Sequence, residues 1–444
     1  MKRFFDTLRN IWTIEELRQR ILVTLGLVLI YRLGSYVVLP GVNVEALAAA
    51  NSNNSQSGGI VGLINMFAGG AFLRASIFGL GIMPYITASI IIQLMGMAVP
   101  YFQKMQREGE SGRKKINQYT RFLTIAVTAV QAPGYIASIK STAPGAFPDV
   151  SGFWWIQSIF ILVTGTMFVM WLGERITDKG LGNGISLIIM IGIISRLPFA
   201  FLSEVKSRTA GNGGLIIFLI EIVILLLVIV GSILLVQGTR RIPVQFAKKI
   251  VGNKQYGGVR QYIPLKVNAA GVMPIIFAQA IMFIPAAVSG FSGTSGGIFS
   301  ERYGFWYNTI FAVLIILFTY FYTAIMVNPN QLADDMKRNG GFIPGVKPGK
   351  KTAEFIDQVM SRITLPGSIF LAGVAIMPAF AQKLGINSSF ADFYGGTSLL
   401  ILVGVVLDTL QQIETYLLNR HYDGLMKSGR IKGRGANAMM VQQG

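Results

Sequence analysis

Residues 214–236 read GLIIFLIEIVILLLVIVGSILLV, an apolar run in which Glu221 is the single charged residue. An α-helix rises about 1.5 Å per residue, so roughly 20 apolar residues cross a hydrocarbon core about 30 Å thick. Similar stretches recur along the chain and alternate with short loops. The pattern predicts an all-α integral membrane protein with ten transmembrane helices. These spans are expected near 21–39, 76–98, 122–139, 153–172, 184–202, 214–236, 268–289, 306–327, 366–384 and 397–417.

The expected spans divide into two halves of five, 21–202 and 214–417, on either side of an external hinge loop at 203–213. An odd number of spans in each half gives the halves opposite orientations in the membrane. This is the arrangement of an inverted repeat around a central path, so two pseudo-symmetric halves are predicted from the count of spans. Cytoplasmic segments, 1–20 and 418–444, complete the chain.

The orientation follows from the basic residues. Of the 39 Lys and Arg residues, 31 lie in the two terminal segments and in every second loop. Loops rich in Lys and Arg stay in the cytoplasm, so both termini are expected there. The basic start MKRFFDTLRN precedes a full apolar span without a small-residue cleavage site, which predicts a retained first helix.

The composition excludes several kinds of chemistry. Charged residues make up 13% of the chain, against about 25% in a typical soluble domain. The chain has no cysteine, and His421 is its one histidine, so thiolate metal sites and cysteine nucleophiles are excluded. No GxxxxGK[ST] string is present to bind a nucleotide. The chain is therefore expected to be no enzyme and to hold no cofactor.

One apolar segment is too short to cross the membrane. Residues 60–73 read IVGLINMFAGGAFL and are broken at Gly69 and Gly70. Such a segment predicts a re-entrant half-helix, which is tolerated only where it lines a cavity inside the protein. A helix lying in the membrane interface fits the pattern equally well.

Two loops on the basic side are unusually long, 238–267 and 328–365, and both mix Lys and Arg with Gly, Pro and aromatic residues. They are expected to form shaped protrusions that favour phosphate backbones or acidic protein surfaces. Topology alone also explains positive charge at these positions.

Polar residues within the spans are functional candidates by default, although a structural role fits them as well. The ionisable ones are Arg32, Glu221, Asp408 and Glu414. The uncharged ones include Thr87, Gln93, Gln131 and Gln279.

Several long strings in this order resemble the SecY/Sec61α family over essentially the whole chain. They are SIFGLGIMPYITASIIIQLM (76–95), QREGESGRKKINQYTR (106–121), GERITDKGLGNGIS (173–186), RRIPVQFAKKIVG (240–252), IPLKVNAAGVMPIIFA (263–278) and GGTSLLILVGVVLD (395–408). The resemblance implies a passive protein-conducting channel in the bacterial plasma (inner) membrane. Such a channel moves unfolded secretory polypeptides across the membrane and releases transmembrane segments sideways into lipid. The implied partners are SecE, SecG, the SecA ATPase, the ribosome through rRNA phosphates and ribosomal proteins, signal sequences and nascent chains, and the lipid bilayer.

The resemblance also implies site residues. An apolar pore ring would be made by Ile82, Ile86, Ile185, Ile189, Ile276 and Ile401. The short re-entrant helix would be a plug with Asn65, Met66, Phe67, Gly69 and Gly70. A lateral gate between the second and seventh spans would include Thr87, Gln93, Gln131 and Ile284. The motor or ribosome contact would be Arg240, Arg241, Lys248, Lys249, Lys347, Lys350 and Lys351. At Lys347 the family usually has arginine, so a forked contact is in doubt there.

Without the resemblance, a secondary transporter of a small solute is an equally good hypothesis, although few charges lie at the predicted midplane. An intramembrane enzyme would need clustered acid–base residues, which the sequence does not offer. A scaffold that only binds ribosomes is a third alternative. The resemblance favours the channel.

Overall fold

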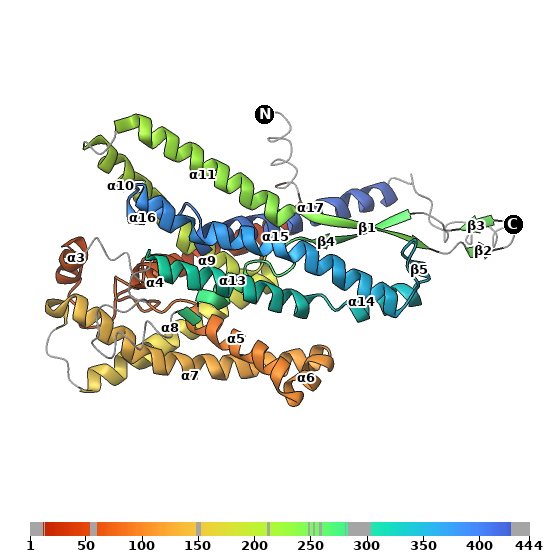
Figure 1. Ribbon diagram of the computed structural model, residues 1–444. Helices are drawn as coiled ribbons and strands as arrows, with labels where there is room; N and C mark the ends of the chain where they lie inside the picture. The colour runs from red at the N-terminus through yellow and green to blue at the C-terminus, as the bar shows by residue number, and fades with distance from the viewer. Residues whose placement is uncertain are drawn as a thin grey trace.

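The computed structural model describes residues 12, 14–53, 60–147, 152–210, 214–246, 249–251, 254–256, 260–279, 281–282 and 303–427. Long helices run side by side, and the strands lie together at one end of the bundle (Figure 1). The helices of the first half are α2 (Glu15–Gly34), α3 (Val44–Asn53), α4 (Ile60–Phe67), α5 (Met83–Ala98), α6 (Pro100–Arg107), α7 (Glu110–Thr142), α8 (Gly152–Lys179), α9 (Gly184–Ile194) and α10 (Leu197–Thr209), with a 3-10 turn η1 (Pro144–Ala146).

The second half follows with α11 (Gly214–Gln237), α13 (Phe305–Met326), α14 (Pro329–Arg338), α15 (Lys350–Lys383), α16 (Ser388–Ala391) and α17 (Gly396–Lys427). Residues 273–279 and 281–282 are also helical. The helices α5, α7 and α8 lie on one side of the bundle, while α11, α13 and α15 lie on the other side (Figure 1). Contacts between α9 and α17 join the two halves.

In the described part of the chain, seven helical segments are long and apolar enough to cross a membrane. An eighth candidate, α5 followed by α6, bends by 101° between Gly96 and Pro100. Together these segments match eight of the ten expected spans. The first expected span is the helix α2, which carries three arginines besides its apolar run. The seventh enters residues outside the described ranges.

Two boundaries differ from the sequence prediction. Residues 76–82, expected to be helical, form turns, and α5 begins only at Met83, where Pro84 occupies the first turn. The hinge loop expected at 203–213 is largely helical, because α10 continues to Thr209. The connection to α11 is therefore only a few residues long. The helical structure of the fifth expected span, 184–202, thus continues through polar residues as far as Thr209.

A buried ion cluster explains why α10 continues. Arg208 donates through Nε to Glu204 Oε1 at 2.8 Å, and its Nη2 donates to Glu221 on α11 and to the Gly385 carbonyl at 2.9 Å. The second Glu204 oxygen accepts from the Asn387 backbone amide at 2.9 Å. All three residues are buried, with at most 6% of their surface exposed. We call Glu204, Arg208 and Glu221 the ion cluster. It ties α10 of the first half to two segments of the second half.

The two long basic loops form one small domain. Strand β1 (Thr239–Phe246) pairs antiparallel with β4 (Arg260–Lys266) and with β5 (Gly341–Phe342), giving the order β4-β1-β5. A separate hairpin joins β2 (Lys249–Val251) to β3 (Lys254–Tyr256). Beneath the sheet, a core of seven buried residues connects the sheet to α14 and the start of α15. The members of this core are Ile242, Val244, Leu265, Met336, Ile343, Ile356 and Met360.

The ion cluster predicts a stability effect. Replacing Arg208 with Ala leaves Glu204 and Glu221 buried without their cation, which typically costs about 3–5 kcal/mol. The thermal unfolding midpoint of purified R208A in detergent should therefore fall well below that of the parent protein. The matched control is Lys206→Ala on the same helix, because Lys206 is exposed. Equal midpoints for the two variants would show that the cluster does not hold α10 and α11 together.

Candidate functional site

An apolar cluster at the centre of the molecule contains every isoleucine expected in the pore ring. Ile82, Ile189 and Ile401 are at most 4% exposed and belong to its buried core. Ile86, Ile185 and Ile276 are partly buried and pack against that core. We call these six isoleucines the collar. They come from α5 and the residue just before it, from α9, from the helical residues after 272, and from α17, so both halves contribute.

Local structure fixes the direction of the collar side chains. The Ile82 carbonyl accepts from the Ile86 amide at 3.1 Å, so these residues have the i, i+4 relation of one helix face. On α9, Asn183 is the N-cap, and its side chain accepts from the amides of Ile185 and Ser186 at 3.1 and 3.3 Å. The helix thus begins immediately before Ile185. β-Branched side chains are stiff about χ1, so each collar side chain has few rotamers available.

The re-entrant segment packs into the same cluster. Helix α4 ends at Phe67, and both Met66 and Phe67 belong to the buried core that contains the collar. The chain then turns through Gly69 at φ +61° and Gly70 at φ +88°, a region that side chains other than glycine rarely adopt. Asn65 closes this turn: its carbonyl accepts from the Gly70 amide at 2.7 Å, and its Oδ1 accepts from the Leu73 amide at 3.1 Å. The sequence prediction of a half-helix broken at the two glycines agrees with this geometry.

Two arginines hold the turn after α4. Arg32 on α2 donates through Nη1 to the Gly69 carbonyl at 3.1 Å, and Arg74 donates to the same oxygen at 3.5 Å. Both guanidinium groups lie over the ring of Tyr36, at 5.5 and 4.2 Å from its centroid. A cation over an aromatic face is attracted by the ring quadrupole. The sequence marked Arg32 only as a charge in a span; its partner and the role of Arg74 were not predicted.

A glycine on α9 lets the plug segment approach closely. A Cβ added at Gly192 would lie 2.5 Å from the Phe67 carbonyl oxygen and 3.2 Å from the Gly69 amide nitrogen. Real Cβ atoms essentially never come this close to backbone atoms, so only glycine fits between α4 and α9 in this arrangement. Sequence reasoning did not single out Gly192.

The residues expected in the lateral gate are only partly brought together. Gln93 on α5 accepts from the Tyr322 hydroxyl of α13 at 3.3 Å and donates to Ser89 at 3.4 Å. Thr87 bonds the Met83 carbonyl of its own helix at 3.1 Å. The side chain of Gln131 on α7 forms no hydrogen bond with the described residues, and Ile284 lies outside them.

The strands and the start of α15, which carry most of the basic residues expected to contact a motor or ribosome, lie at one end of the molecule (Figure 1). Arg240 and Arg241 are exposed on β1, and Lys347 is exposed in the turn before α15. Lys350 is exposed at the start of α15, and Lys351 pairs with Glu354 at 2.7 Å. Lys249 lies on β2, and Lys248 lies outside the described residues. Exposed cations from both long loops therefore lie in the small domain at this end of the molecule.

The described residues contain no group of three or more His, Asp or Glu side chains that could hold a metal ion. The collar itself contains only aliphatic side chains. What the arrangement offers is a cluster of aliphatic side chains from both halves, into which a short helix packs.

Comparisons with known proteins agree on one family. A family model described as SecY matches residues 76–410. The protein translocase subunit SecY of Streptomyces scabiei is 44% identical, covering 93% of this chain and 97% of the relative. The subunit of the same name from Mycobacterium bovis is 41% identical, covering 96% of this chain and all of the relative.

Solved structures of the same kind share the fold. One reported as "The structure of a protein conducting channel" has a TM-score of 0.65 at 18% identity, covering 90% of this chain and 92% of that chain. Sec61 in a canine ribosome-channel complex from the endoplasmic reticulum has a TM-score of 0.62 at 17% identity, with the same coverage of 90% and 92%.

The close contact at Gly192 predicts how the plug segment can be displaced. In a Met66→Cys background, we expect Gly192→Ala to push Phe67 away from α9 and to raise the rate at which a water-soluble maleimide labels position 66. The natural chain has no cysteine, so the label reports this position alone. The matched control is Gly373→Ala on α15, where an added Cβ meets nothing within 4 Å. Equal labelling rates in the two variants would contradict the seating of the plug against α9.

Proposed function

Because this chain belongs to the SecY family, we propose that it is the central subunit of a passive protein-conducting channel that works as follows. Unfolded secretory polypeptides cross the membrane through the collar. Transmembrane segments leave sideways into lipid. The chain is a multi-pass membrane protein and is not itself an enzyme. A secondary transporter, the alternative function, has no support from the family.

The observation that carries this function is the collar with the plug against it. Six isoleucines from both halves meet in one buried cluster, and Met66 and Phe67 pack into the same cluster. A narrow apolar constriction excludes water and ions by dewetting. Its aliphatic walls fit around an extended polypeptide of any sequence, because they offer no hydrogen bond that a particular side chain must satisfy.

The plug is suited to leave when a chain enters. Its helix has eight residues, and arginine side chains hold the following turn through one carbonyl oxygen, that of Gly69. The glycines at 69 and 70 supply the hinge. Removing so short a segment from the cluster parts apolar surfaces, and the entering polypeptide covers the collar again.

Sideways release requires a seam that opens between helices. We place it between α5 and the segment formed by residues 273–282 and α13. Across it, Gln93 and Tyr322 share a hydrogen bond of 3.3 Å, a contact that an apolar helix can replace at modest cost. An inserting signal helix opens this seam only to the extent that it binds the open form better than the closed one. Thr87, Gln131 and Ile284 complete the proposed gate.

Energy must come from partners, because the chain has no nucleotide-binding fingerprint. The sheet β4-β1-β5 and the turn at Lys347 present exposed cations at one end of the molecule. We place this end in the cytoplasm of a bacterium, where SecA and the ribosome dock, with both termini on the same side of the plasma membrane. SecE and SecG are the expected companion subunits. One solved structure with this fold is Sec61 in a ribosome-channel complex, which supports the ribosome as a partner.

Disulfide cross-linking tests the conduction path. With one cysteine at Ile401 and another in a stalled secretory precursor, an adduct should form in the presence of SecA and SecE, and only when the signal sequence is functional. The matched control is a cysteine at Leu410, which lies about two and a half turns farther along the same helix, on its opposite face, and is 49% exposed. An adduct at Leu410 as strong as that at Ile401, or none at Ile401 despite an engaged motor, would overturn the proposal.

Charge reversal tests the docking surface. Lys347→Glu should weaken the binding of SecA or ribosomes most strongly at low salt, because salt screens the attraction between exposed charges. Co-sedimentation with reconstituted vesicles measures this at several salt concentrations. Lys206→Glu is the control, since this lysine is exposed on α10, which lies at the end of the molecule opposite the sheet (Figure 1). Unchanged binding of K347E at low salt would remove Lys347 from the contact.

A further inference from the structure

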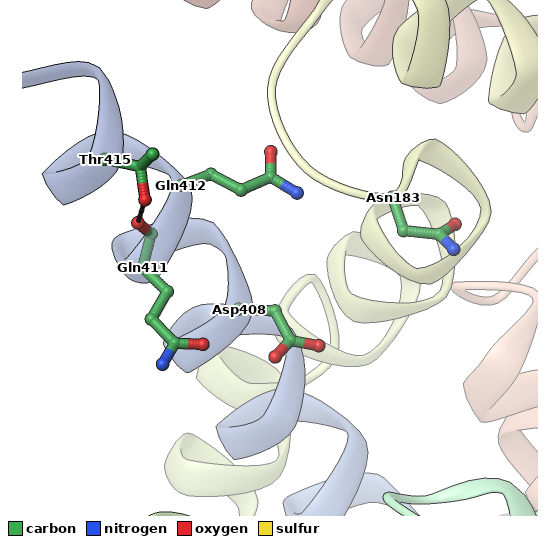
Figure 2. Close-up of a pocket in the computed structure, with 5 residues that line it drawn as sticks. All are labelled: Asn183, Asp408, Gln411, Gln412 and Thr415. Atoms are coloured by element: carbon green, nitrogen blue, oxygen red, sulfur yellow. Dashed lines mark hydrogen bonds between the residues drawn. The ribbon is translucent and has the colours of Figure 1, made fainter. Parts of the chain in front are cut away.

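A polar hollow of about 390 Å³ lies between α17 and the turn that joins α8 to α9. Its lining consists of five residues, Asn183, Asp408, Gln411, Gln412 and Thr415. Figure 2 shows Asp408 and Gln412 pointing from α17 toward the segment that bears Asn183. The walls are fixed, because Gln412 Oε1 accepts from the Gly182 amide at 2.8 Å. The function proposed above assigns no role to this hollow.

The hollow continues the path of the collar. Asp408 follows Ile401 by seven residues, so it lies on the same face of α17 about 10.5 Å farther along the axis. Val405 lies between them in the buried core that contains the collar. On the opposite wall, Asn183 precedes Ile185 by two residues. Helix α17 runs from α16 toward the end where the sheet lies, so the hollow is on the sheet side of the collar (Figure 1).

The lining carries a single charge, the exposed carboxylate of Asp408. Asp408 is its only ionisable residue, and this carboxylate forms no hydrogen bond or ion pair with any described residue. The nearby cation Arg20 is already engaged by the Gly180 carbonyl at 3.2 Å, by the ring of Tyr416 and by Glu16. The whole chain carries a net charge of +19, so a free carboxylate here is a local exception to a basic molecule. The neighbouring amides and hydroxyl suit the backbone of an extended polypeptide.

We propose that this hollow receives the cationic segment that precedes the apolar part of an entering secretory signal, with Asp408 as the counter-charge. Secretory signals begin with a positively charged region followed by an apolar stretch. With the apolar stretch near the collar and the gate, the preceding residues lie on the sheet side, within reach of Asp408. The hollow thereby holds the positive end of the signal on the cytoplasmic side while the rest of the chain advances. This inference rests on the proposed function.

The test compares signals that differ only in charge. A cysteine at Gln411 is cross-linked to a cysteine in the N-terminal segment of a stalled precursor bearing either several lysines or several serines. Replacing Asp408 with Asn should lower the adduct yield of the lysine precursor by about threefold to fivefold, the scale of a partly exposed charge pair. The serine precursor should be unaffected. Asp408→Lys should favour a precursor with glutamates in the same segment.

The controls separate this inference from the function itself. Glu414→Gln removes an exposed carboxylate of α17 that does not line the hollow, and it should leave both yields unchanged. If D408N affects lysine and serine precursors equally, or neither of them, the hollow does not recognise charge and the inference is overturned. A cysteine at Ile401 that still captures the same precursors when Asp408 is replaced shows that the conduction path is intact. If the cysteine at Ile401 forms no adduct even with Asp408 in place, the proposed function is overturned.

Discussion

Backbone amides in hydrocarbon have no water to bond, so a segment at membrane depth must be helical or must find its partners inside the protein. Residues 68–82 are the exception that this constraint shapes. Asn65 bonds the amides of Gly70 and Leu73, while strand-like contacts pair the Ile77 amide with the Val37 carbonyl and the Leu39 amide with the Ala75 carbonyl. The broken segment survives because neighbouring protein satisfies it. The end of α4 therefore packs into the same buried core as the collar.

The same constraint governs the buried charges. A charge removed from water is tolerated when it is paired and hydrogen-bonded. Arg208 meets both conditions through Glu204, Glu221 and the Gly385 carbonyl. Arg32 is hydrogen-bonded to the Gly69 carbonyl and lies over the ring of Tyr36, but neither partner carries a negative charge. The first arrangement suits a permanent joint between the halves, whereas the second suits a segment that has to be released.

Much of the fold follows from short-range patterns that the sequence states directly. Apolar runs of about 20 residues predict the spans, and a pair of glycines after a short apolar run predicts the broken helix. Non-local partners escape this reasoning. No local pattern predicts that residues 203–209 are helical, because Glu221, the partner that stabilises Arg208, comes later in the chain. The joining of β1 with β5 across almost a hundred residues is hidden for the same reason.

The collar shows a different limit. Isoleucines with i, i+4 spacing occur in any apolar span, so the residues alone could not distinguish Ile185 and Ile189 from ordinary packing. Only the resemblance to a family pointed to them. The contact with Gly192 was equally invisible, because a glycine in an apolar helix says nothing about which backbone approaches it. The packing of α4 against α9 supplies that information.

These contacts also differ in how much free energy it costs to break them. Separating the collar side chains exposes aliphatic surface, which costs a free energy of about 25 cal/mol for each Å² exposed to water. An entering polypeptide covers that surface again and recovers this free energy. At the α5–α13 seam, the hydrogen bond between Gln93 and Tyr322 is worth about 1 kcal/mol net. At the α10–α11 joint, breaking the ion cluster strands buried charges at a cost of about 3–5 kcal/mol. In the function proposed above, the weaker contacts of the α5–α13 seam part first when a polypeptide enters, while the ion cluster keeps α10 and α11 joined.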